Sequence, residues 1–213
     1  MSQQCPPWQG PELPHLRGYV LSAMSDFHAF ASRKCKDYII THGDIKTWHG
    51  RLFERVVPLA YYAGSYRADD QGKRCLQVDV GVGGRSGTPY PSVLSQMREF
   101  SARLFELTKQ TDEYVGAAPN GASRAIAAVH LAAFAAGRLV QIHPFLNGNG
   151  RMSRLTANYF LMRYDYPVLY QQAIDRPVHP TYADASALCM TGDFNGMYKW
   201  LLGVLTGQVS ATP

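Results

Sequence analysis

One histidine, a glycine-rich turn and two arginines lie close together between Gln141 and Arg154. A glycine-rich turn that runs into a helix directs several backbone N–H groups at one spot, which makes a site for an anion. Arg151 and Arg154 are three positions apart, so on a helix they share a face and both reach a polyphosphate. His143 can accept a proton from a hydroxyl near neutral pH. Together these residues predict group-transfer chemistry on a nucleotide.

Each of these residue types also has a plainer interpretation. An isolated histidine at a helix end is usually satisfied by a backbone carbonyl, and arginines on one helix face usually form a solvated basic surface. Their combination in one string favours the chemical interpretation, with His143 as the general base for an attacking hydroxyl. Glycine is needed in the turn because a β-carbon would block positive backbone angles and the approach of a phosphate. The predicted phosphate- and nucleotide-binding residues are Gly148, Asn149, Gly150, Arg151 and Arg154.

Residues 143–154, His-Pro-Phe-Leu-Asn-Gly-Asn-Gly-Arg-Met-Ser-Arg, resemble the signature of Fic-domain proteins, His-Pro-Phe-x-(Asp/Glu)-Gly-Asn-Gly-Arg-x-x-Arg. A match of this length is far more specific than a lone three-glycine pattern. Gly64–Arg67 is similar to the family's Gly-x-Tyr-Arg element, and Tyr182–Asp193 is similar to its C-terminal Tyr…Gly-Asp element. Residues 78–91 resemble the hairpin flap that docks the target protein. The resemblance therefore covers residues 45–205, which is most of the chain.

The resemblance implies an all-α, Fic-like helical domain with a small β-hairpin flap, and it implies a protein nucleotidyltransferase. Such an enzyme moves AMP from ATP to a Ser, Thr or Tyr hydroxyl of a target protein (AMPylation), with Mg²⁺ beside the phosphates. His143 would be the catalytic residue, and Arg154 would reach the terminal phosphate. Gly150 agrees with nucleotidyl transfer, because relatives that transfer the terminal phosphate carry lysine at this position.

The same resemblance assigns protein partners. A target protein would dock on a flap edge formed by Val78, Val80 and Val82. Tyr182 would form a wall of the base pocket, with a packing role as the equal alternative. The family's inhibitory helix motif, Ser/Thr-x-x-x-Glu-Gly/Asn, is not found in the sequence, since the nearest match, Ser95–Phe100, fails at its last position. Inhibition of the transfer activity would therefore come from a separate inhibitory partner protein or be absent.

Two residues depart from the Fic pattern. Asn147 stands where the family carries an acidic residue that holds Mg²⁺, and a neutral carboxamide is a weaker ligand for a hard cation. Met190 stands where relatives often carry an asparagine that reads adenine. These departures keep two alternatives open: a Fic fold that uses another nucleotide or phosphate-linked donor, and a weakened module that only binds nucleotide or protein.

Composition indicates one globular domain, because 213 residues with 46% hydrophobic and 17% charged residues can bury a core. The net charge of +5 agrees with binding of phosphates but is too small to require nucleic acid, and no RNA-binding motif is recognised. The four cysteines lack Cys-x-x-Cys spacing, which predicts no zinc site and suits unpaired cysteines in a reducing compartment. Neither a secretory signal nor an apolar run of membrane-spanning length is recognised. We therefore expect a cytoplasmic protein with no membrane contact, and export by a signal-independent route stays open.

Four prolines near the N-terminus predict an irregular arm over residues 1–16, followed by a single domain over residues 17–213. Apolar residues at three-to-four spacing predict helices through most of that domain. Alternation over residues 77–82, followed by Gly83 and Gly84, predicts a strand and the turn of a hairpin. The expected helices cover residues 21–38, 45–64, 94–104, 126–140, 151–164, 182–190 and 194–204.

Overall fold

A computed structural model describes residues 5–8, 14–68, 71–167 and 180–209 of the chain. Helices dominate these residues, and the β-structure among them is a two-stranded antiparallel hairpin. The predicted all-α class with a small hairpin is therefore confirmed. The helices are α1 (Pro14–Lys34), α2 (His42–Phe53), α3 (Val93–Ala117), α4 (Gly121–Ile142), α5 (Asn149–Arg163), α7 (Pro180–Cys189) and α8 (Asn195–Leu205), and the strands are β1 (Gly81–Val82) and β2 (Arg85–Ser86).

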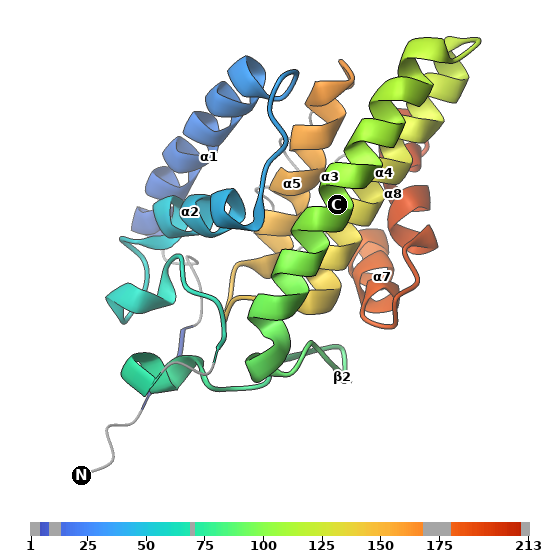
Figure 1. The fold of residues 1–213 in the computed structure, drawn as a ribbon. Coiled ribbons are helices and arrows are strands. Elements are labelled where there is room, and N and C mark those ends of the chain that lie inside the picture. The colour runs from blue at the N-terminus through green and yellow to red at the C-terminus, as the bar shows by residue number, and fades with distance from the viewer. Residues whose placement is uncertain (1–4, 9–13, 69–70, 168–179, 210–213) are drawn as a thin grey trace.

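Helices α4 and α5 form the centre of the fold (Figure 1). Helix α4 packs against α3, α5, α7 and α8, while α1 and α2 pack against α5 on the side away from α7 and α8. Small residues allow this close packing, since a β-carbon on Gly137 of α4 would lie 2.7 Å from the ring of Phe194. Helix α5 is buried over most of its length, so its first turn, which carries the signature residues, starts inside the protein.

Helix α4 is long and apolar enough, by length and composition alone, to cross a membrane. The expectation that no run in the chain reaches this length is therefore wrong for α4. However, 61% of its most apolar window is buried inside the protein, where it contacts four other helices. A helix whose apolar side chains are mostly buried against neighbouring helices is typical of the core of a folded domain, so we interpret α4 as a core helix.

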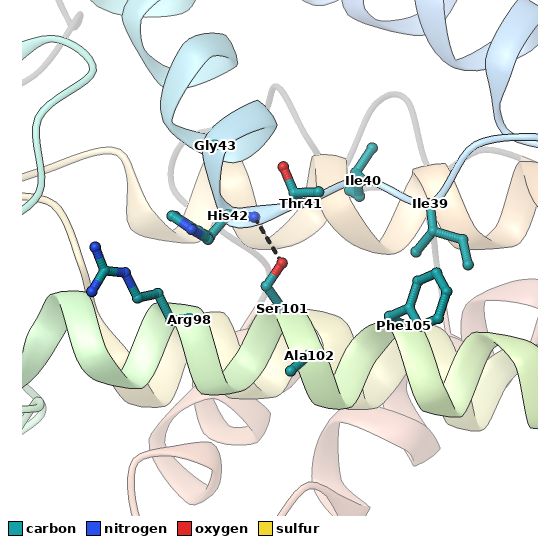
Figure 2. A pocket seen from close by; sticks show the side chains of 9 residues that line it. All are labelled: Ile39, Ile40, Thr41, His42, Gly43, Arg98, Ser101, Ala102 and Phe105. Carbon is teal, nitrogen blue, oxygen red and sulfur yellow. Dashed lines mark hydrogen bonds between the residues drawn. The ribbon is translucent and has the colours of Figure 1, made fainter.

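The start of α2 is fixed by local signals and by a contact with α3. The Thr41 hydroxyl accepts a hydrogen bond from the Asp44 N–H, and the Asp44 carboxylate accepts one from the Thr41 N–H, which makes a capping box. The His42 N–H donates to the Ser101 hydroxyl on α3 at 3.1 Å (Figure 2). This contact lies beside a groove of about 480 Å³ between residues 39–43 and α3. The capped start therefore sets α2 against α3.

Several boundaries differ from the expected ones; α3, for example, continues to Ala117 rather than ending near residue 104. Helix α2 ends at Phe53 rather than near residue 64. Pro58 would in any case prevent the helix from continuing to residue 64, because it disfavours helical backbone in the residue before it. Helix α1 begins at Pro14, inside the arm predicted to be irregular, and proline suits the first turn of a helix. The β1–β2 pairing joins only two residues of each strand, so residues 77–80 are not part of a strand. Residues 1–4 and 9–13 of the predicted arm lie outside the described residues.

A disulfide joins Cys5 to Cys75, which are 70 positions apart. The expectation of unpaired cysteines is therefore wrong for this pair, because spacing in the sequence does not show which cysteines meet in the fold. Cys35 and Cys189 are free and buried. Since disulfides are typical of oxidising compartments, the cysteines no longer favour a reducing one.

Candidate active site

The signature residues form a tight loop between α4 and α5. His143 ends α4 with left-handed backbone angles (φ 52°, ψ 57°), which histidine adopts more often than most residues. Its N–H still donates to the Leu139 carbonyl at 3.0 Å. The Asn149 side chain closes the loop, because its Oδ1 accepts from the Phe145 N–H at 2.9 Å and its Nδ2 donates to the Phe145 carbonyl at 2.8 Å. The Asn149 side chain therefore shapes the predicted anion hole by holding the loop closed.

Gly148 is the residue at which the chain passes from this loop into α5. Its φ of 80° favours glycine, and a β-carbon there would lie 2.5 Å from the ring of Phe53. Helix α5 begins at Asn149, two residues earlier than expected, so Asn149, Gly150 and Arg151 provide the first-turn N–H groups that lack acceptors within the helix. Among the described residues, no side chain caps this helix start. Such a helix start suits an anion.

The imidazole of His143 is held as a neutral base. Its Nδ1 lies 3.2 Å from the Val140 carbonyl oxygen, which can only accept, so Nδ1 carries the proton and Nε2 keeps its lone pair. Burial is the main cause that lowers the pKa of His143 to about 4; the Val140 hydrogen bond opposes this shift and the charge of Arg67 adds to it. At neutral pH the ring is therefore unprotonated and can accept a proton at Nε2.

Arg67 anchors both the end of α4 and the hairpin, a role that the sequence interpretation did not assign. Its fully buried guanidinium donates from Nε to the His143 carbonyl at 2.8 Å. Nη2 donates to the carbonyls of Ile142 at 3.2 Å and Thr88 at 2.8 Å, and Nη1 donates to the Val78 carbonyl at 3.0 Å. One planar group thus fixes His143, the predicted general base, and the hairpin together. The match to the Gly-x-Tyr-Arg element was the signal that could have indicated this role.

The base of the hairpin lies against His143. A β-carbon on Gly87, the residue after β2, would come within 3.0 Å of the His143 Cβ. The Gly87 N–H donates to the Val80 carbonyl at 2.8 Å, which closes the hairpin. Gly83 and Gly84 form its turn with φ values of 57° and 77°, as the sequence predicts. A protein bound along the hairpin would therefore lie next to the histidine.

His49 supports the loop from α2. Its Nδ1 accepts from the Gly64 N–H at 2.9 Å, so Nε2 carries the proton and donates to the Asn147 carbonyl at 3.0 Å. The ring stacks on Phe145 with 3.6 Å between the ring centroids. Burial lowers the pKa of His49 to about 3, so the ring is neutral in the folded protein. Its role is to hold the loop in position.

We expect His49→Gln to reduce the loss of stability in acid. In the unfolded chain His49 takes up a proton near pH 6.5, but in the folded protein only near pH 3. The unfolding free energy therefore decreases as the pH is lowered from 6.5 toward 3. His49 alone should account for about 2 kcal/mol of the unfolding free energy lost between pH 7 and pH 5. Urea unfolding at both pH values measures this difference. His130→Gln, a change at an exposed histidine of α4, is the matched control, and an equal pH dependence in the two variants would contradict the prediction.

The signature arginines and Tyr182 meet at the first turns of α5. Arg151 and Arg154 are only 5% and 3% exposed, so they do not form a solvated basic face. The guanidinium carbon of Arg154 lies 4.7 Å from the Tyr182 ring centroid, and that of Arg151 lies 5.8 Å from the Phe53 centroid. The Tyr182 hydroxyl donates to the Gly150 carbonyl at 3.2 Å. The structure thus brings these predicted nucleotide-binding residues together.

Asn147 uses both ends of its side chain inside the protein. Its Nδ2 donates to the Trp8 carbonyl at 3.0 Å, and its Oδ1 accepts from the Gly148 N–H at 2.6 Å. Trp8 is 139 positions away in the sequence, so the N-terminal segment reaches the loop directly. The carboxamide that replaces the expected acidic residue therefore has a structural function.

The family of the chain follows from comparison with known proteins. The model of the Fic/DOC family matches residues 39–161, more than half of the chain. The chain belongs to the Fic/DOC family. Its fold is similar to that of a Fic domain-containing signaling protein from Bacteroides thetaiotaomicron, with a TM-score of 0.52 and 17% identity. That similarity covers 92% of this chain and 74% of the other chain.

Two curated proteins named Protein adenylyltransferase Fic share short stretches with this chain. The Drosophila persimilis protein is 59% identical over 39 residues, and the Drosophila grimshawi protein is 53% identical over 45 residues. These stretches cover 18% and 21% of this chain, and 8% and 9% of the two relatives. The chain therefore matches less than a tenth of the length of these relatives.

The residues of this Fic domain do not fit a protein-bound Mg²⁺ ion. Hard divalent cations prefer several oxygen ligands, most of them charged. Asn147, at the position of the Fic acidic residue, offers a neutral oxygen that already accepts a hydrogen bond from Gly148. In the part of the chain that the structure describes, no three His, Cys, Asp or Glu residues are grouped so that they could hold a metal. A magnesium centre therefore does not follow from the donor set.

The predicted docking residues of the Fic flap differ in exposure. Val78 is 39% exposed, while Val80 and Val82 are half-buried. The carbonyls of Val78 and Val80 already accept hydrogen bonds from Arg67 and Gly87. The backbone edge that could pair with a target protein is therefore shorter than the sequence alternation predicts.

Proposed function

We propose that this Fic-domain chain transfers AMP from ATP to a Ser, Thr or Tyr hydroxyl of a target protein. The observation that carries the proposal is the neutral imidazole of His143 at one end of a loop that leads into α5, whose start is capped by no side chain among the described residues. A base next to an anion site is the arrangement that nucleotidyl transfer requires. The short identities with proteins named Protein adenylyltransferase Fic support the same reaction.

In the proposed reaction, Nε2 of His143 takes the proton of the target hydroxyl while the hydroxyl oxygen attacks the α-phosphorus of ATP. A bond forms between that oxygen and the α-phosphorus, the bond from the α-phosphorus to the bridging oxygen breaks, and pyrophosphate leaves. The first-turn N–H groups of α5 and the side chains of Arg151 and Arg154 would stabilise the charge on the phosphates. Arg67 would keep His143 in line through its bond to the His143 carbonyl.

The hairpin is the proposed docking site of the target protein. Because Gly87 lies against His143, a segment bound along the hairpin would bring its hydroxyl close to Nε2. Val78, which is exposed, would contribute a side-chain contact beside this segment. A separate inhibitory partner protein would supply the restraint on the reaction. Of the two proposed locations, the cytoplasm and the exterior after signal-independent export, the Cys5–Cys75 disulfide favours export.

The donor could differ from ATP within the same site. Met190, directly after α7, is buried and offers a thioether where an asparagine could form two hydrogen bonds to adenine. The proposed roles of His143 and α5 would suit any nucleoside triphosphate, because His143 would act on the target hydroxyl and the start of α5 on the phosphates rather than on the base. A weakened module that only binds nucleotide or protein is the second alternative, and Asn147 is the observation that favours it.

The decisive experiment compares ATP labelled at the α-phosphate with ATP labelled at the γ-phosphate. The protein is incubated with a lysate, Mg²⁺ and each donor, and labelled proteins are separated on a gel. We expect covalent label from the α-labelled donor and none from the γ-labelled donor. Transfer from γ-labelled ATP would indicate phosphoryl transfer, and label from neither, with ATP bound, would indicate a binding module. Parallel reactions with α-labelled GTP, UTP and CTP identify the preferred base.

We expect Asn147→Asp to increase the Mg²⁺ dependence of transfer at a cost in stability. The carboxylate adds a charged oxygen for the cation, so transfer at saturating Mg²⁺ should rise several-fold. The same change removes the donor to the Trp8 carbonyl, which should lower the unfolding free energy by about 1 kcal/mol. Titration of Mg²⁺ in the label assay and urea unfolding measure the two effects. Asn120→Asp at the cap of α4 is the matched control, and an unchanged Mg²⁺ dependence in Asn147→Asp would contradict the metal argument.

A further inference from the structure

Residues Cys5–Trp8, which we name the N-terminal strap, connect the disulfide to the signature loop. Cys5 is bonded to Cys75. The Pro6 carbonyl accepts a hydrogen bond from the Tyr62 hydroxyl at 3.1 Å. The Trp8 carbonyl accepts one from Asn147 Nδ2 at 3.0 Å. The strap is therefore held at its start, in its middle and at its end, and its end contacts the loop that follows His143.

The Trp8 ring packs against the residues that support this loop. Its centroid lies 5.3 Å from that of Phe53, 5.8 Å from that of His49 and 6.3 Å from that of Tyr62. Phe53 is the ring that a β-carbon on Gly148 would strike. His49 holds the backbone of the loop through its Nε2 donor. Trp8 thus packs behind the two rings that set the position of the loop.

The strap gives a physical reason for the amide at residue 147. The Trp8 carbonyl can only accept a hydrogen bond, so its partner must be a donor. Asn147 supplies that donor, whereas an ionised carboxylate at the same place would bring two acceptors together. The departure from the Fic signature therefore occurs at the residue that contacts the strap.

We propose that the strap is a redox-sensitive positioning element: the Cys5–Cys75 disulfide keeps Trp8 on the signature loop, and reduction of the disulfide releases it. Without the covalent bond, the strap would keep two hydrogen bonds and the packing of one ring. Ordering a terminal segment costs conformational entropy, which these contacts must offset alone. Because the bond joins residues 70 positions apart, its loss removes the covalent link that holds the strap beside Cys75.

The reductant is a dithiol. Its thiolate attacks the sulfur of Cys5, which belongs to an exposed residue, while Cys75 is only 7% exposed. This step forms a mixed disulfide with Cys5 and releases the Cys75 thiolate, which takes up a proton. The second thiol of the reductant then attacks its own mixed-disulfide sulfur and releases the Cys5 thiol. The protein gains two thiols, and the reductant becomes a cyclic or protein disulfide.

Loss of ATP affinity on reduction is the consequence that rests on the proposed function, whereas release of the loop does not. The test therefore uses the full chain with and without dithiothreitol, and it measures both the release of the loop and the affinity for ATP. Hydrogen exchange at the amides of Phe145 and Gly148 reports on the loop. Acrylamide quenching of Trp8 fluorescence, with Trp8→Phe as the reference, reports on the strap. Titration with ATP reports on the nucleotide site.

On reduction we expect exchange at these amides to rise by about tenfold, Trp8 to become more accessible, and the dissociation constant for ATP to rise by roughly three- to tenfold. Cys5→Ser/Cys75→Ser should show the same values without reductant and no response to it. Trp8→Ala should reproduce the loop exchange of the reduced protein with its disulfide intact, while Trp8→Phe should retain most of the oxidised behaviour. In the label assay the released loop should raise KM for ATP more than it lowers kcat.

Cys189→Ser, which changes a buried free cysteine, is the matched control and should respond to reductant as the unaltered protein does. Equal loop exchange in the oxidised and reduced protein would overturn the proposal. A loop that responds in a protein that binds no ATP would support the strap and count against the proposed function. The two proposals therefore fail by different measurements.

Discussion

His143→Ala is expected to lower the rate of AMP transfer by about 10³-fold, because it removes the group that accepts the proton of the attacking hydroxyl. The affinity for ATP should change less than threefold, since the first-turn N–H groups of α5 and the two arginines are untouched. Single-turnover transfer from α-labelled ATP and an ATP binding titration measure the two quantities. A variant that still transfers label at one tenth of the original rate would rule out His143 as the base.

His143→Asn separates the chemistry of the side chain from the strain of the backbone. The residue has φ of 52°, and asparagine adopts this region more easily than alanine. We therefore expect His143→Asn to fold at least as well as His143→Ala and to be as inactive. His130→Ala changes an exposed histidine on the same helix and should keep full activity.

The pH dependence of transfer provides a second check on His143. Its pKa is lowered to about 4, so the neutral base is present above that value and is lost as the pH falls through it. The rate should therefore stay constant from pH 8 to pH 6 and decline with a midpoint near pH 4. A midpoint near 6.5 would mean that the ring is solvated. Circular dichroism at each pH separates this decline from the acid unfolding expected of His49.

Local signals in the sequence were sufficient for the fold class and for the contents of the loop. The apolar spacing predicts α3, α4, α5, α7 and α8, because each helix buries a periodic set of side chains in the common core. Gly83 and Gly84 predict the hairpin turn, because both need positive φ. The signature string predicts that His143 and the start of α5 are neighbours, since only a short loop separates them. All of these features are encoded within a few residues of one another.

The contacts that position the site could not be predicted in this way, because they join distant parts of the chain. Arg67 reaches the His143 carbonyl across 76 positions, and Asn147 reaches the Trp8 carbonyl across 139. Every residue has a backbone carbonyl, so the sequence does not indicate which carbonyl will accept a hydrogen bond from a distant side chain. The cysteine spacing likewise does not distinguish the bonded pair Cys5 and Cys75 from the free cysteines. The sequence therefore predicts which groups would do the chemistry, but not which groups hold them in place.

Arg67→Met should have the largest effect on stability among single changes near the site. The change removes a fully buried guanidinium and leaves the carbonyls of His143, Ile142, Thr88 and Val78 without this donor. Loss of a buried charged network of this kind costs about 3–5 kcal/mol of unfolding free energy. Urea unfolding at pH 7 measures the loss.

A loss of unfolding free energy does not by itself show that Arg67 positions His143. The control must therefore be another arginine that donates short hydrogen bonds but lies away from His143. Arg163, at the end of α5, donates to the Asp112 carboxylate from Nε at 2.9 Å and from Nη2 at 2.7 Å. Arg163→Met should also lower stability, but should leave transfer per folded molecule unchanged.

The pKa of His143 discriminates between an anchor and a merely stabilising residue. The positive charge of Arg67 lowers this pKa, so Arg67→Met should raise it, and histidine ring resonances followed by NMR across pH would show the change. Arg163→Met should leave the His143 titration where it is. Transfer should fall in Arg67→Met even at low temperature, where the variant is fully folded, because the imidazole is no longer held beside the hairpin. The two variants could instead lose equal stability while the His143 titration and the transfer rate stay unaltered in both. Arg67 would then be only a packing residue, and Gly87 alone would link the hairpin to the base.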